Sequence, residues 1–405
     1  MCTWCGDPAH IDSAPAPARR TLLKAGLGLA SASLLAGVPA PAQAAPKGGR
    51  APEGPVPAKA LGATDAKSPL KPLSIQRRAV GPNDVLLDVL YCGICHSDIH
   101  AARSEWSPTR YPCVPGHEVI GRVQAVGSAV TRFKVGDIGG VGCMVGSCGE
   151  CENCLADREQ NCLKGTVFTY DAPDPSTGSH TLGGYSDKMV VPERFVLRIP
   201  PGADLAATAP LLCAGVTCFS PMQHWKLSPG QRVGVVGLGG LGHMAVKLAA
   251  ARRADVTVFT TSPGKLADAR RLGAKRAVLS TDAAAMKEHA GTCDLVIATV
   301  PRAFDMGPFM NVLKLDGTLV NVGALEALKG LDGMAMAFGR KSVAGSLIGG
   351  VAETQEMLDY CAARGIKADV ELVRAQDVNR AYARIVNKDV RYRLVIDMAS
   401  LKTGT

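Results

Sequence analysis

The alternation of apolar runs with glycine and proline predicts an irregular β domain in the first half of the folded chain. Short apolar runs of β type fill the stretch from about Pro69 to Pro201, and glycine or proline interrupts them. Val85–Tyr91 and Glu118–Val126 are two such runs. Short runs bounded in this way are typical of strands joined by turns.

The pattern changes after about Leu205 and predicts a parallel sheet up to Ile348. Apolar β runs here alternate with stretches of helical periodicity: Val233–Val236, Val256–Phe259, Ala277–Leu279, Leu295–Ala298 and Thr318–Val322. Strands that alternate with helices at this spacing form βαβ units with parallel strands. Beyond Gly350, two amphipathic helices and a last β run are expected: Glu353–Arg364, Val378–Val386 and Tyr392–Ile396.

Residues 1–44 predict an export signal. The paired Arg19 and Arg20 precede a short apolar stretch, Ala25–Val38, and the small residues of Ala42–Ala44. These three features are typical of a twin-arginine signal peptide. A Sec-type signal and a retained membrane anchor are the alternatives, although a spanning helix needs about 20 strongly apolar residues. We therefore expect a periplasmic protein with no stable membrane insertion after processing, or a cytoplasmic one if the signal is not used.

Length and composition indicate a folded chain of two or three domains behind a short linker. Residues 45–61 are rich in proline, glycine and alanine and predict a flexible linker. Hydrophobic residues make up 47% of the 405 residues and charged residues 20%, which excludes a largely disordered protein. The net charge of +9 is not gathered in a basic run, and only 4% of the residues are aromatic. No nucleic-acid partner is therefore expected.

A glycine motif between a predicted strand and a predicted helix indicates a dinucleotide site. Gly237-Leu-Gly239-Gly240-Leu241-Gly242 follows the run Val233–Val236 and opens a helical stretch. Gly237 would allow the tight turn, Gly239 would let the backbone approach a pyrophosphate, and Gly242 would let the helix pack against the strand. The N–H groups at the start of the helix, from Gly240 and Leu241 onward, would bind the anion.

The end of the next strand favours NADP over NAD. An NAD site places an acid about 20 residues beyond the glycines, at the strand end. No acid stands at the end of this strand, since Asp255 lies at its beginning. The strand ends instead in hydroxyls and a cation: Thr260, Thr261, Ser262 and Lys265. Such groups suit a 2′-phosphate. Ser262 is also a candidate N-cap for the following helix, with Pro263 at its first position.

Four closely spaced cysteines predict a structural metal site. Cys148, Cys151, Cys154 and Cys162 lie within 15 residues. Four thiolates in this spacing match a closed tetrahedral zinc site, which has no position open for a substrate. Disulfide pairing and an iron–sulfur cluster are the alternatives, since thiolate spacing alone does not determine the metal.

A second group of metal-binding residue types is divided between two segments. Cys95-His-Ser97-Asp98-Ile-His100 is followed downstream by His117 and Glu118. Together these segments offer a thiolate, imidazoles and carboxylates. A catalytic zinc needs three protein ligands and one open position.

These motifs resemble those of the zinc-dependent medium-chain alcohol dehydrogenases, specifically the NADP-using aldehyde reductases that are similar to cinnamyl alcohol dehydrogenase. The resemblance covers about Gly62 to Leu401. It rests on the four-cysteine segment, the glycine motif and four further motifs: Tyr91-Cys-Gly-Ile-Cys-His-Ser-Asp98, Pro115-Gly-His-Glu118, Thr181-Leu-Gly-Gly-Tyr185 and Pro210-Leu-Leu-Cys-Ala-Gly-Val-Thr217. It implies a GroES-like catalytic domain of residues 62–204 and 349–405, and a Rossmann-type NADP-binding domain of residues 205–348.

The resemblance also assigns roles to individual residues. It implies that Cys95, His117 and Cys213 hold a catalytic zinc, which Glu118 can approach. Cys213 lies more than 90 residues after His117, so spacing alone does not indicate it. The remaining implied roles are orientation of His117 by Asp98, a proton relay through Ser97 and His100, and a substrate-pocket wall at Trp106. The cysteines that match no ligand position are Cys92, Cys113, Cys143, Cys218, Cys293 and Cys361.

The implied reaction is reversible hydride transfer between NADP(H) and primary alcohols or aldehydes. Aldehyde reduction over a broad aromatic and aliphatic range is the expected direction, with two zinc ions per chain and a homodimer as the implied assembly. One alternative is a zinc-independent quinone or enone reductase. Such enzymes lack the three zinc ligands, so Cys95, His117 and Cys213 argue against this alternative. The other is a non-catalytic, zinc-stabilised dinucleotide-binding sensor, which would need neither Ser97 nor His100.

Overall fold

The computed structural model describes residues 52–403. The predicted signal peptide, with Arg19 and Arg20, and the first part of the predicted linker lie outside these residues. Within residues 52–403, no single helix combines the length and apolarity needed to cross a membrane. Only a pair bent by 53°, Leu205–Leu212 with Ala214–His224, meets those limits by length and composition.

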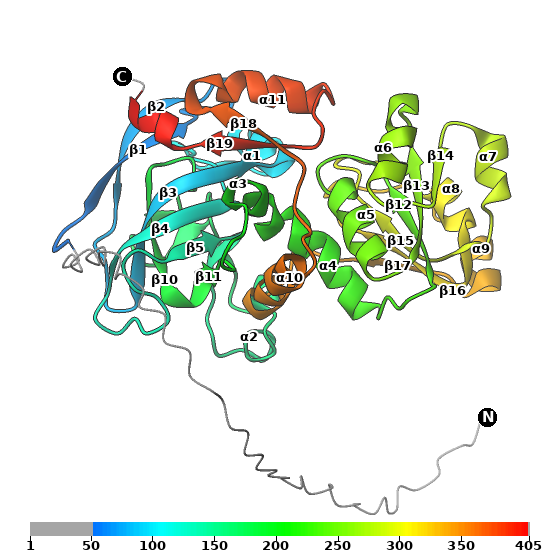
Figure 1. Cartoon of the computed structure of the whole chain (residues 1–405), viewed down its shortest axis with the longest axis horizontal. Coiled ribbons are helices and arrows are strands. Elements are labelled where there is room, and N and C mark those ends of the chain that lie inside the picture. The colour runs from blue at the N-terminus through cyan, green and yellow to red at the C-terminus, as the bar shows by residue number, and fades with distance from the viewer. Residues whose placement is uncertain (1–51, 404–405) are drawn as a thin grey trace, which may run out of the picture. The chain divides into compact units, whose positions relative to one another are not determined.

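A seven-stranded sheet forms the core of the first domain (Figure 1). The strand order is β11-β5-β4-β3-β19-β18, and β10 also pairs with β3. The strands are β3 (Asp84–Ile94), β4 (Val119–Val126), β5 (Ile138–Val141), β10 (Lys188–Pro192), β11 (Leu197–Arg198), β18 (Val370–Arg374) and β19 (Arg393–Asp397). β3 is antiparallel to β4, β10 and β19, so the last strand of the chain pairs with one of the first.

The β domain begins earlier than expected. β1 (Val56–Gly62) and β2 (Lys71–Arg77) form an antiparallel pair in which Val56 faces Arg77. Val56, Ala58 and Ala60 are buried while the residues between them are exposed. This alternation is typical of a strand with one face on the core. The prediction of a flexible linker is therefore wrong for residues 56–61, because small alanines and Pro57 hide the alternation in the sequence.

The second domain contains six parallel strands in the order β14-β13-β12-β15-β16-β17. They are β12 (Arg232–Val236), β13 (Asp255–Thr260), β14 (Arg276–Leu279), β15 (Cys293–Ala298), β16 (Leu313–Asn321) and β17 (Ser342–Gly345). Valine and isoleucine fill the central strands and are fully buried, as parallel strands covered on both faces require. Five strands were expected from the sequence, but β17 was not, since Ser-Val-Ala-Gly carries little apolar signal.

Helices connect these strands and cross between the two domains (Figure 1). Those of the parallel-sheet domain are α5 (Gly242–Ala251), α6 (Leu266–Arg271), α7 (Ala283–Glu288), α8 (Gly307–Asn311) and α9 (Gly333–Gly339). Those around the β domain are α1 (His96–Ala102), α2 (Glu152–Leu155), α3 (Leu205–Thr208), α4 (Ala214–His224), α10 (Val351–Ala363), α11 (Val378–Val386) and α12 (Ala399–Thr403).

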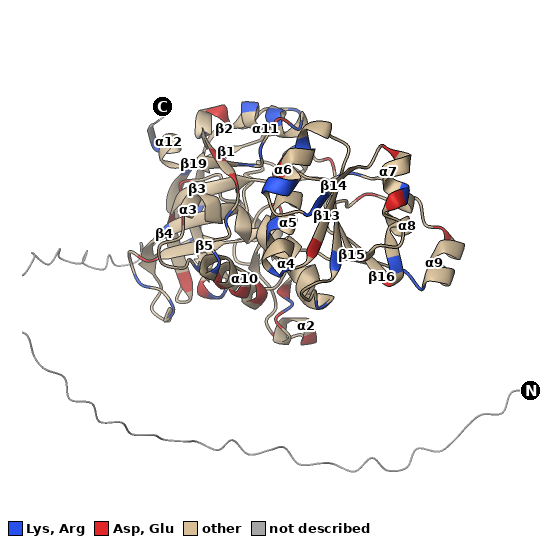
Figure 2. Cartoon of the chain, turned by 45° about the vertical axis from the view of Figure 1, so that its right-hand side comes forward, with Lys and Arg blue, Asp and Glu red and all other residues tan. Residues whose placement is uncertain are grey.

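Short elements complete the structure. The small strands are β6 (Met144–Gly146) with β7 (Val167–Phe168), and β8 (Pro173–Asp174) with β9 (Ser179–His180). The 3₁₀ turns are η1 (Glu159–Asn161), η2 (Glu193–Phe195), η3 (Ala209–Leu212), η4 (Pro263–Lys265) and η5 (Ala375–Asp377). In the view of Figure 2, basic and acidic residues are interspersed over the elements.

Candidate active site

Four side chains from three separate segments converge on one buried point. Cys95, His117, Glu118 and Cys213 each offer a ligand atom, and these atoms lie within 4.8 Å of one another. Cys95 precedes α1, His117 and Glu118 precede β4, and Cys213 stands between η3 and α4. All four are buried. The structure therefore brings together the residues that the resemblance implied as metal ligands, including the distant Cys213.

Asp98 is the residue that fixes the geometry of this cluster. Its carboxylate is completely buried and accepts hydrogen bonds from the backbone of Cys95 at 2.8 Å and of Gly116 at 3.1 Å. His117 Nδ1 and the Tyr185 hydroxyl lie at 3.1 Å from its two oxygens. With Nδ1 held by the carboxylate, Nε2 of His117 is the nitrogen left for a metal, which is the usual arrangement of metal-bound histidines.

The donor set suits zinc. Two sulfurs and one imidazole nitrogen leave a fourth tetrahedral position open, as in catalytic zinc sites. A hydrogen bond from Cys213 lowers the pKa of Cys95 well below its usual value despite burial, and His117 and Arg393 lower it further. The thiolate is the form that binds metal. Cys95, His117 and Cys213 therefore fit a zinc ion, with Glu118 beside it.

Arg393 links this cluster to the glycine loop, although sequence reasoning did not single it out. Its guanidinium forms an ion pair with Glu118, and both side chains are nearly inaccessible to solvent. Burial raises the pKa of Glu118 to about 7 against the opposing charge of Arg393. Arg393 also lies against Gly240, where a Cβ would stand 2.7 Å from the guanidinium. Arg393 begins β19, so only the pairing of β19 with β3 places it here.

The predicted proton relay lies on α1. His100 places Nδ1 2.5 Å from Glu105 Oε2, and its ring stacks on Trp106 with centroids 4.4 Å apart. Nε2 of His100 is buried and has no hydrogen-bond partner among the described residues. Ser97, on the same helix, hydrogen-bonds with Tyr170. Ser97 and His100 are thus one helical turn apart, with Trp106 packed on the histidine.

Tyr170 is a second residue that sequence reasoning missed. Its ring centroid is 5.5 Å from that of His117, and burial raises the pKa of its phenol well above the usual value. The phenol therefore stays protonated, and its oxygen can accept from the Ser97 hydroxyl. No local signal marks Tyr170 in the sequence, because it follows the short strand β7 in an irregular segment.

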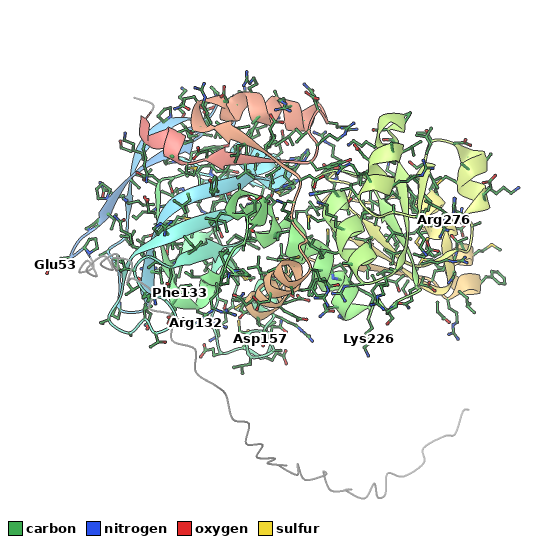
Figure 3. All side chains as sticks on the ribbon, viewed as in Figure 1. Glu53, Arg132, Phe133, Asp157, Lys226 and Arg276 are labelled. Carbon is green, nitrogen blue, oxygen red and sulfur yellow. The ribbon has the colours of Figure 1, made fainter. Side chains whose placement is uncertain are left out.

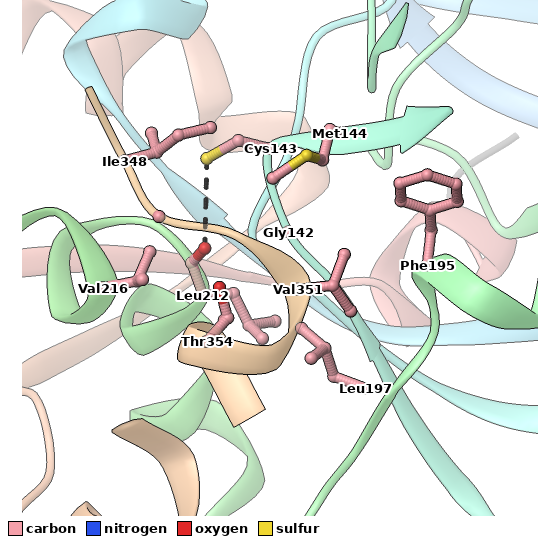
Figure 4. A pocket seen from close by; sticks show the side chains of 11 residues that line it. Gly142, Cys143, Met144, Phe195, Leu197, Leu212, Val216, Ile348, Val351 and Thr354 are labelled. Carbon is pink, nitrogen blue, oxygen red and sulfur yellow. Dashed lines mark hydrogen bonds between the residues drawn. The ribbon is translucent and has the colours of Figure 1, made fainter. Parts of the chain in front are cut away.

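Cys143, which matched no ligand position, lies against the metal cluster. A hydrogen bond with Cys143 raises the pKa of Cys213 well above its usual value. On its other side Cys143 borders an apolar cavity of about 10 Å³ that also contacts Leu212, Val216 and Ile348 (Figure 4). The dashed line in that view joins Cys143 Sγ to the Leu212 carbonyl oxygen at 3.9 Å. A cavity this small holds at most one water molecule, so it is not a substrate site.

The four remaining predicted ligands form a separate lobe. The sulfurs of Cys148, Cys151, Cys154 and Cys162 lie within 4.8 Å of one another, and no disulfide joins the cysteines of residues 52–403. Backbone N–H groups of Cys154 and Leu163 lower the pKa of Cys151 to about 6. A closed set of four thiols supported by N–H···S bonds fits a structural zinc ion.

Buried Glu159 anchors this lobe to the start of α10. Its carboxylate accepts from Arg194 and from the backbone N–H of Val351, each at 3.1 Å. Glu159 is 2% exposed. A hydrogen bond from the Val351 backbone therefore ties the lobe to the segment through which the chain returns from the parallel-sheet domain.

The glycine loop has the geometry that its motif predicted. Gly237 adopts a φ of +88°, a conformation that residues with a Cβ rarely adopt. A Cβ on Gly242 would collide with the Gly237 carbonyl oxygen, so only glycine lets α5 start this close to β12. Gly239 faces open space, and Leu241 immediately precedes α5. The loop thus presents backbone N–H groups at the start of a ten-residue helix, which suits a pyrophosphate.

Comparison with known proteins decides the family. Residues 81–201 match the alcohol dehydrogenase GroES-like domain, and residues 240–363 match the zinc-binding dehydrogenase family. The chain is 51% identical over 345 residues to aldehyde reductase YahK of Escherichia coli K12, covering 85% of this chain and 99% of the relative. This protein belongs to the zinc-binding alcohol dehydrogenase family.

Further relatives of this alcohol dehydrogenase agree. NADP-dependent alcohol dehydrogenase C 1 of Mycolicibacterium smegmatis is 50% identical over 85% of this chain and 99% of the relative. The structure superposes on a cinnamyl alcohol dehydrogenase of Sorghum bicolor with a TM-score of 0.83, at 46% identity over 85% of this chain and 98% of that one. A Helicobacter pylori enzyme solved with NADP(H) gives 0.81, at 40% identity over 85% and 99%. The predicted family and the predicted GroES-like and Rossmann-type fold are confirmed.

The predicted 2′-phosphate residues of this alcohol dehydrogenase lie together beside the glycine loop. Thr260 ends β13, and its hydroxyl accepts from the Ser262 backbone at 3.2 Å. Ser262 precedes the turn Pro263–Lys265, but its side chain makes no capping hydrogen bond. Lys265 reaches back to the glycine loop, where Nζ donates to the Leu238 carbonyl oxygen at 2.8 Å.

No acid occupies the end of β13 where a ribose-binding carboxylate would stand. Thr261 is exposed there. Asp255, at the opposite end of the strand, is paired at 2.5 Å with Arg276, which Figure 3 labels. Asp255 is therefore engaged elsewhere.

Proposed function

We propose that this protein reduces aldehydes to primary alcohols with NADPH, and catalyses the reverse reaction with NADP, at a zinc ion. The observation that carries the proposal is the position of Arg393, which contacts both Glu118 of the metal cluster and Gly240 of the dinucleotide loop. A two-sulfur, one-imidazole cluster next to a dinucleotide loop suits hydride transfer to a polarised carbonyl. The names of the aldehyde reductase and NADP-dependent relatives support the same substrate class and coenzyme.

In this proposal, Cys95, His117 and Cys213 hold zinc, which supplies a Lewis acid, while the nicotinamide coenzyme supplies the hydride. Asp98 holds the imidazole of His117 in the orientation that binding requires. The Ser97 hydroxyl exchanges a proton with the substrate oxygen, and Tyr170 orients that hydroxyl. His100 keeps its buried Nε2 free of partners among the described residues, so this nitrogen can take part in the proton relay. Trp106 packs on His100 and borders the substrate.

The choice of NADP rests on Thr260, Thr261 and Lys265. Hydroxyls and an ammonium can donate to a 2′-phosphate, whereas a carboxylate at this place would repel it. The protein would thus resemble its NADP-dependent relatives in coenzyme preference.

Consumption of NADPH tests the function directly. Purified zinc-loaded protein should lower the absorbance at 340 nm when benzaldehyde is added with NADPH, and should do so much less with NADH. Coenzyme binding without turnover would support the sensor alternative. Turnover that survives complete removal of zinc, with a quinone or enone as substrate, would support a zinc-independent reductase instead.

We also propose a homodimer built on the parallel-sheet domain. β17 is an edge strand of the sheet, and edge strands are ready templates for pairing with another chain. The neighbouring α9 buries none of its residues and exposes Met334 by 70% and Phe338 by 82%. Apolar side chains exposed beside an open edge suit a second copy of this chain.

The site of action is a separate proposal. The paired Arg19 and Arg20 support export by the twin-arginine route, with a mature protein that begins near Ala45. Export of folded protein would let both metal sites load before translocation.

A further inference from the structure

A segment of the β domain passes beside the coenzyme site. The chain between α11 and β19, shown in red in Figure 1, turns toward α5 and α6. At its end Arg393 lies against Gly240, and the Tyr392 ring stacks on His243 of α5, with centroids 5.1 Å apart and planes 9° apart. The segment is thus packed on the same helix start that would receive the pyrophosphate.

The residue before these two, Arg391, reaches α6 of the parallel-sheet domain. Arg391 Nε and the Tyr392 hydroxyl both lie 2.8 Å from Asp268 Oδ2. Asp268 belongs to the first turn of α6, directly after the turn that carries Lys265. The ion pair therefore holds Arg391 against the first turn of α6, which follows the turn that carries Lys265.

The charges around Lys265 are unbalanced. Burial lowers the pKa of Lys265, and the positive charges of Arg391 and Lys388 lower it further. Lys388 is exposed, and within residues 52–403 its side chain forms no ion pair. Arg391 and Lys388 therefore stand close enough to Lys265 to repel its ammonium, and Asp268 supplies an opposing charge. A bound dianion would relieve this repulsion.

Arg391 has unused hydrogen-bond donors that could bind such an anion. Only Nε of Arg391 is engaged, and its two terminal nitrogens make no hydrogen bond within the described part of the chain. A guanidinium with free terminal nitrogens offers the planar fork that binds phosphate oxygens in pairs.

We propose that Arg391 is a coenzyme-specificity residue, which binds the 2′-phosphate of NADP together with Thr260 and Lys265 while Asp268 positions it. The inference rests on the proposed use of NADP. It adds a residue from the β domain to a site that the sequence assigned to the parallel-sheet domain alone. Asp268 acts only through Arg391 and Tyr392, because its own carboxylate would repel the phosphate.

Binding of coenzyme fragments to the full-length, zinc-loaded protein tests the inference without turnover. The probes are 2′,5′-ADP and 5′-AMP, which differ only in the 2′-phosphate, with affinities measured by isothermal titration calorimetry. Arg391→Met should lower the affinity for 2′,5′-ADP by about tenfold to a hundredfold, the range for a charge-assisted hydrogen bond. The same substitution should change the affinity for 5′-AMP by less than about twofold. Arg380→Met removes an exposed arginine of α11 that pairs with Asp377, and should leave both affinities unchanged.

Two further variants separate phosphate binding from a purely structural tie between domains. Arg391→Lys keeps the charge but not the planar fork, so it should restore part of the affinity for 2′,5′-ADP. Asp268→Asn should lower the preference for 2′,5′-ADP over 5′-AMP by releasing Arg391. Circular dichroism establishes that each variant is folded, and the lysine variant tests the inference if the methionine variant is not.

The outcomes are distinct. Equal weakening of both probes by Arg391→Met would overturn the inference and leave Arg391 as a structural tie. A wild-type preference for 2′,5′-ADP that Arg391→Met does not change would overturn it while the proposed NADP use stands. Equal wild-type affinity for the two probes would overturn the NADP assignment as well.

Discussion

Glu118 and Arg393 form an ion pair inside the protein that joins the last strand of the chain to the metal cluster. A buried pair of this kind is costly to break, because the remaining charge loses its partner in a site without water. Arg393→Met should lower the free energy of unfolding by about 3–5 kcal/mol, as measured by urea denaturation. Combining it with Glu118→Gln should recover part of that loss. Additive losses would show that the two side chains are not energetically coupled.

The two metal sites should respond differently to loss of a ligand. Wild-type protein should hold two zinc ions per chain by inductively coupled plasma mass spectrometry. Cys151→Ser should lose one zinc ion and lower the melting temperature, because the binding energy of a structural metal is also folding energy. Cys95→Ala should abolish turnover while the melting temperature stays near that of the wild type. One zinc ion per wild-type chain would contradict the two-site interpretation.

His243 should make stability depend on pH. Nδ1 lies 2.8 Å from the Gly240 carbonyl oxygen and Nε2 accepts from the Asp369 backbone at 3.3 Å, so the site requires a neutral imidazole. Burial, with help from Lys247 and Arg393, lowers the pKa of His243 to about 3. Since this pKa is depressed in the folded state, the contribution to stability is complete above about pH 6.5 and is lost as the pH falls toward 3.

The expected size of this effect is up to about 5 kcal/mol between pH 6.5 and pH 3, from roughly 1.36 kcal/mol per pKa unit. Urea denaturation between pH 7 and pH 4 should show a shallower decline for His243→Gln than for the wild type, whatever its stability at pH 7. Parallel curves for the two proteins would show that the pKa of His243 is not depressed in the folded state.

The proposed dimer should depend on the exposed face of α9. Wild-type protein should show twice the chain mass by light scattering coupled to size-exclusion chromatography. The double variant Met334→Glu, Phe338→Glu should be monomeric, since it places charges in the proposed apolar interface. Leu155→Glu changes an exposed apolar side chain far from α9 in the sequence, on the four-cysteine lobe, and this variant should remain dimeric. A monomeric wild type would reject the assembly.

Export should require the paired arginines. Replacing Arg19 and Arg20 with lysine should keep the precursor inside the cell, because the twin-arginine route recognises the arginine pair itself. Arg50→Lys, beyond the predicted cleavage site, should not affect export. Cell fractionation with detection of the precursor and mature forms measures both. Unchanged export of the double variant would exclude this route.

The sequence by itself determined the features that depend on neighbours along the chain. The glycine loop, the four-cysteine lobe and most strands were predicted because turn geometry, metal-ligand spacing and apolar period are local properties. Gly237 shows this well, since its place between a strand and a helix was enough to predict the turn that it adopts. Cys213 was indicated only by family resemblance, because nothing local distinguishes it from a buried thiol.

Tertiary structure decided everything that depends on which segments meet. Pairing of β19 with β3 places Arg393 between Glu118 and Gly240, and the turn before β19 brings Arg391 to Asp268. In the sequence these arginines are ordinary charges in a polar stretch. The periodicity of a strand records which face is buried, but it does not record the neighbour across the sheet or the loop at its end. Burial then makes these contacts chemically important, because a charge removed from water interacts strongly with whatever side chain the fold places beside it.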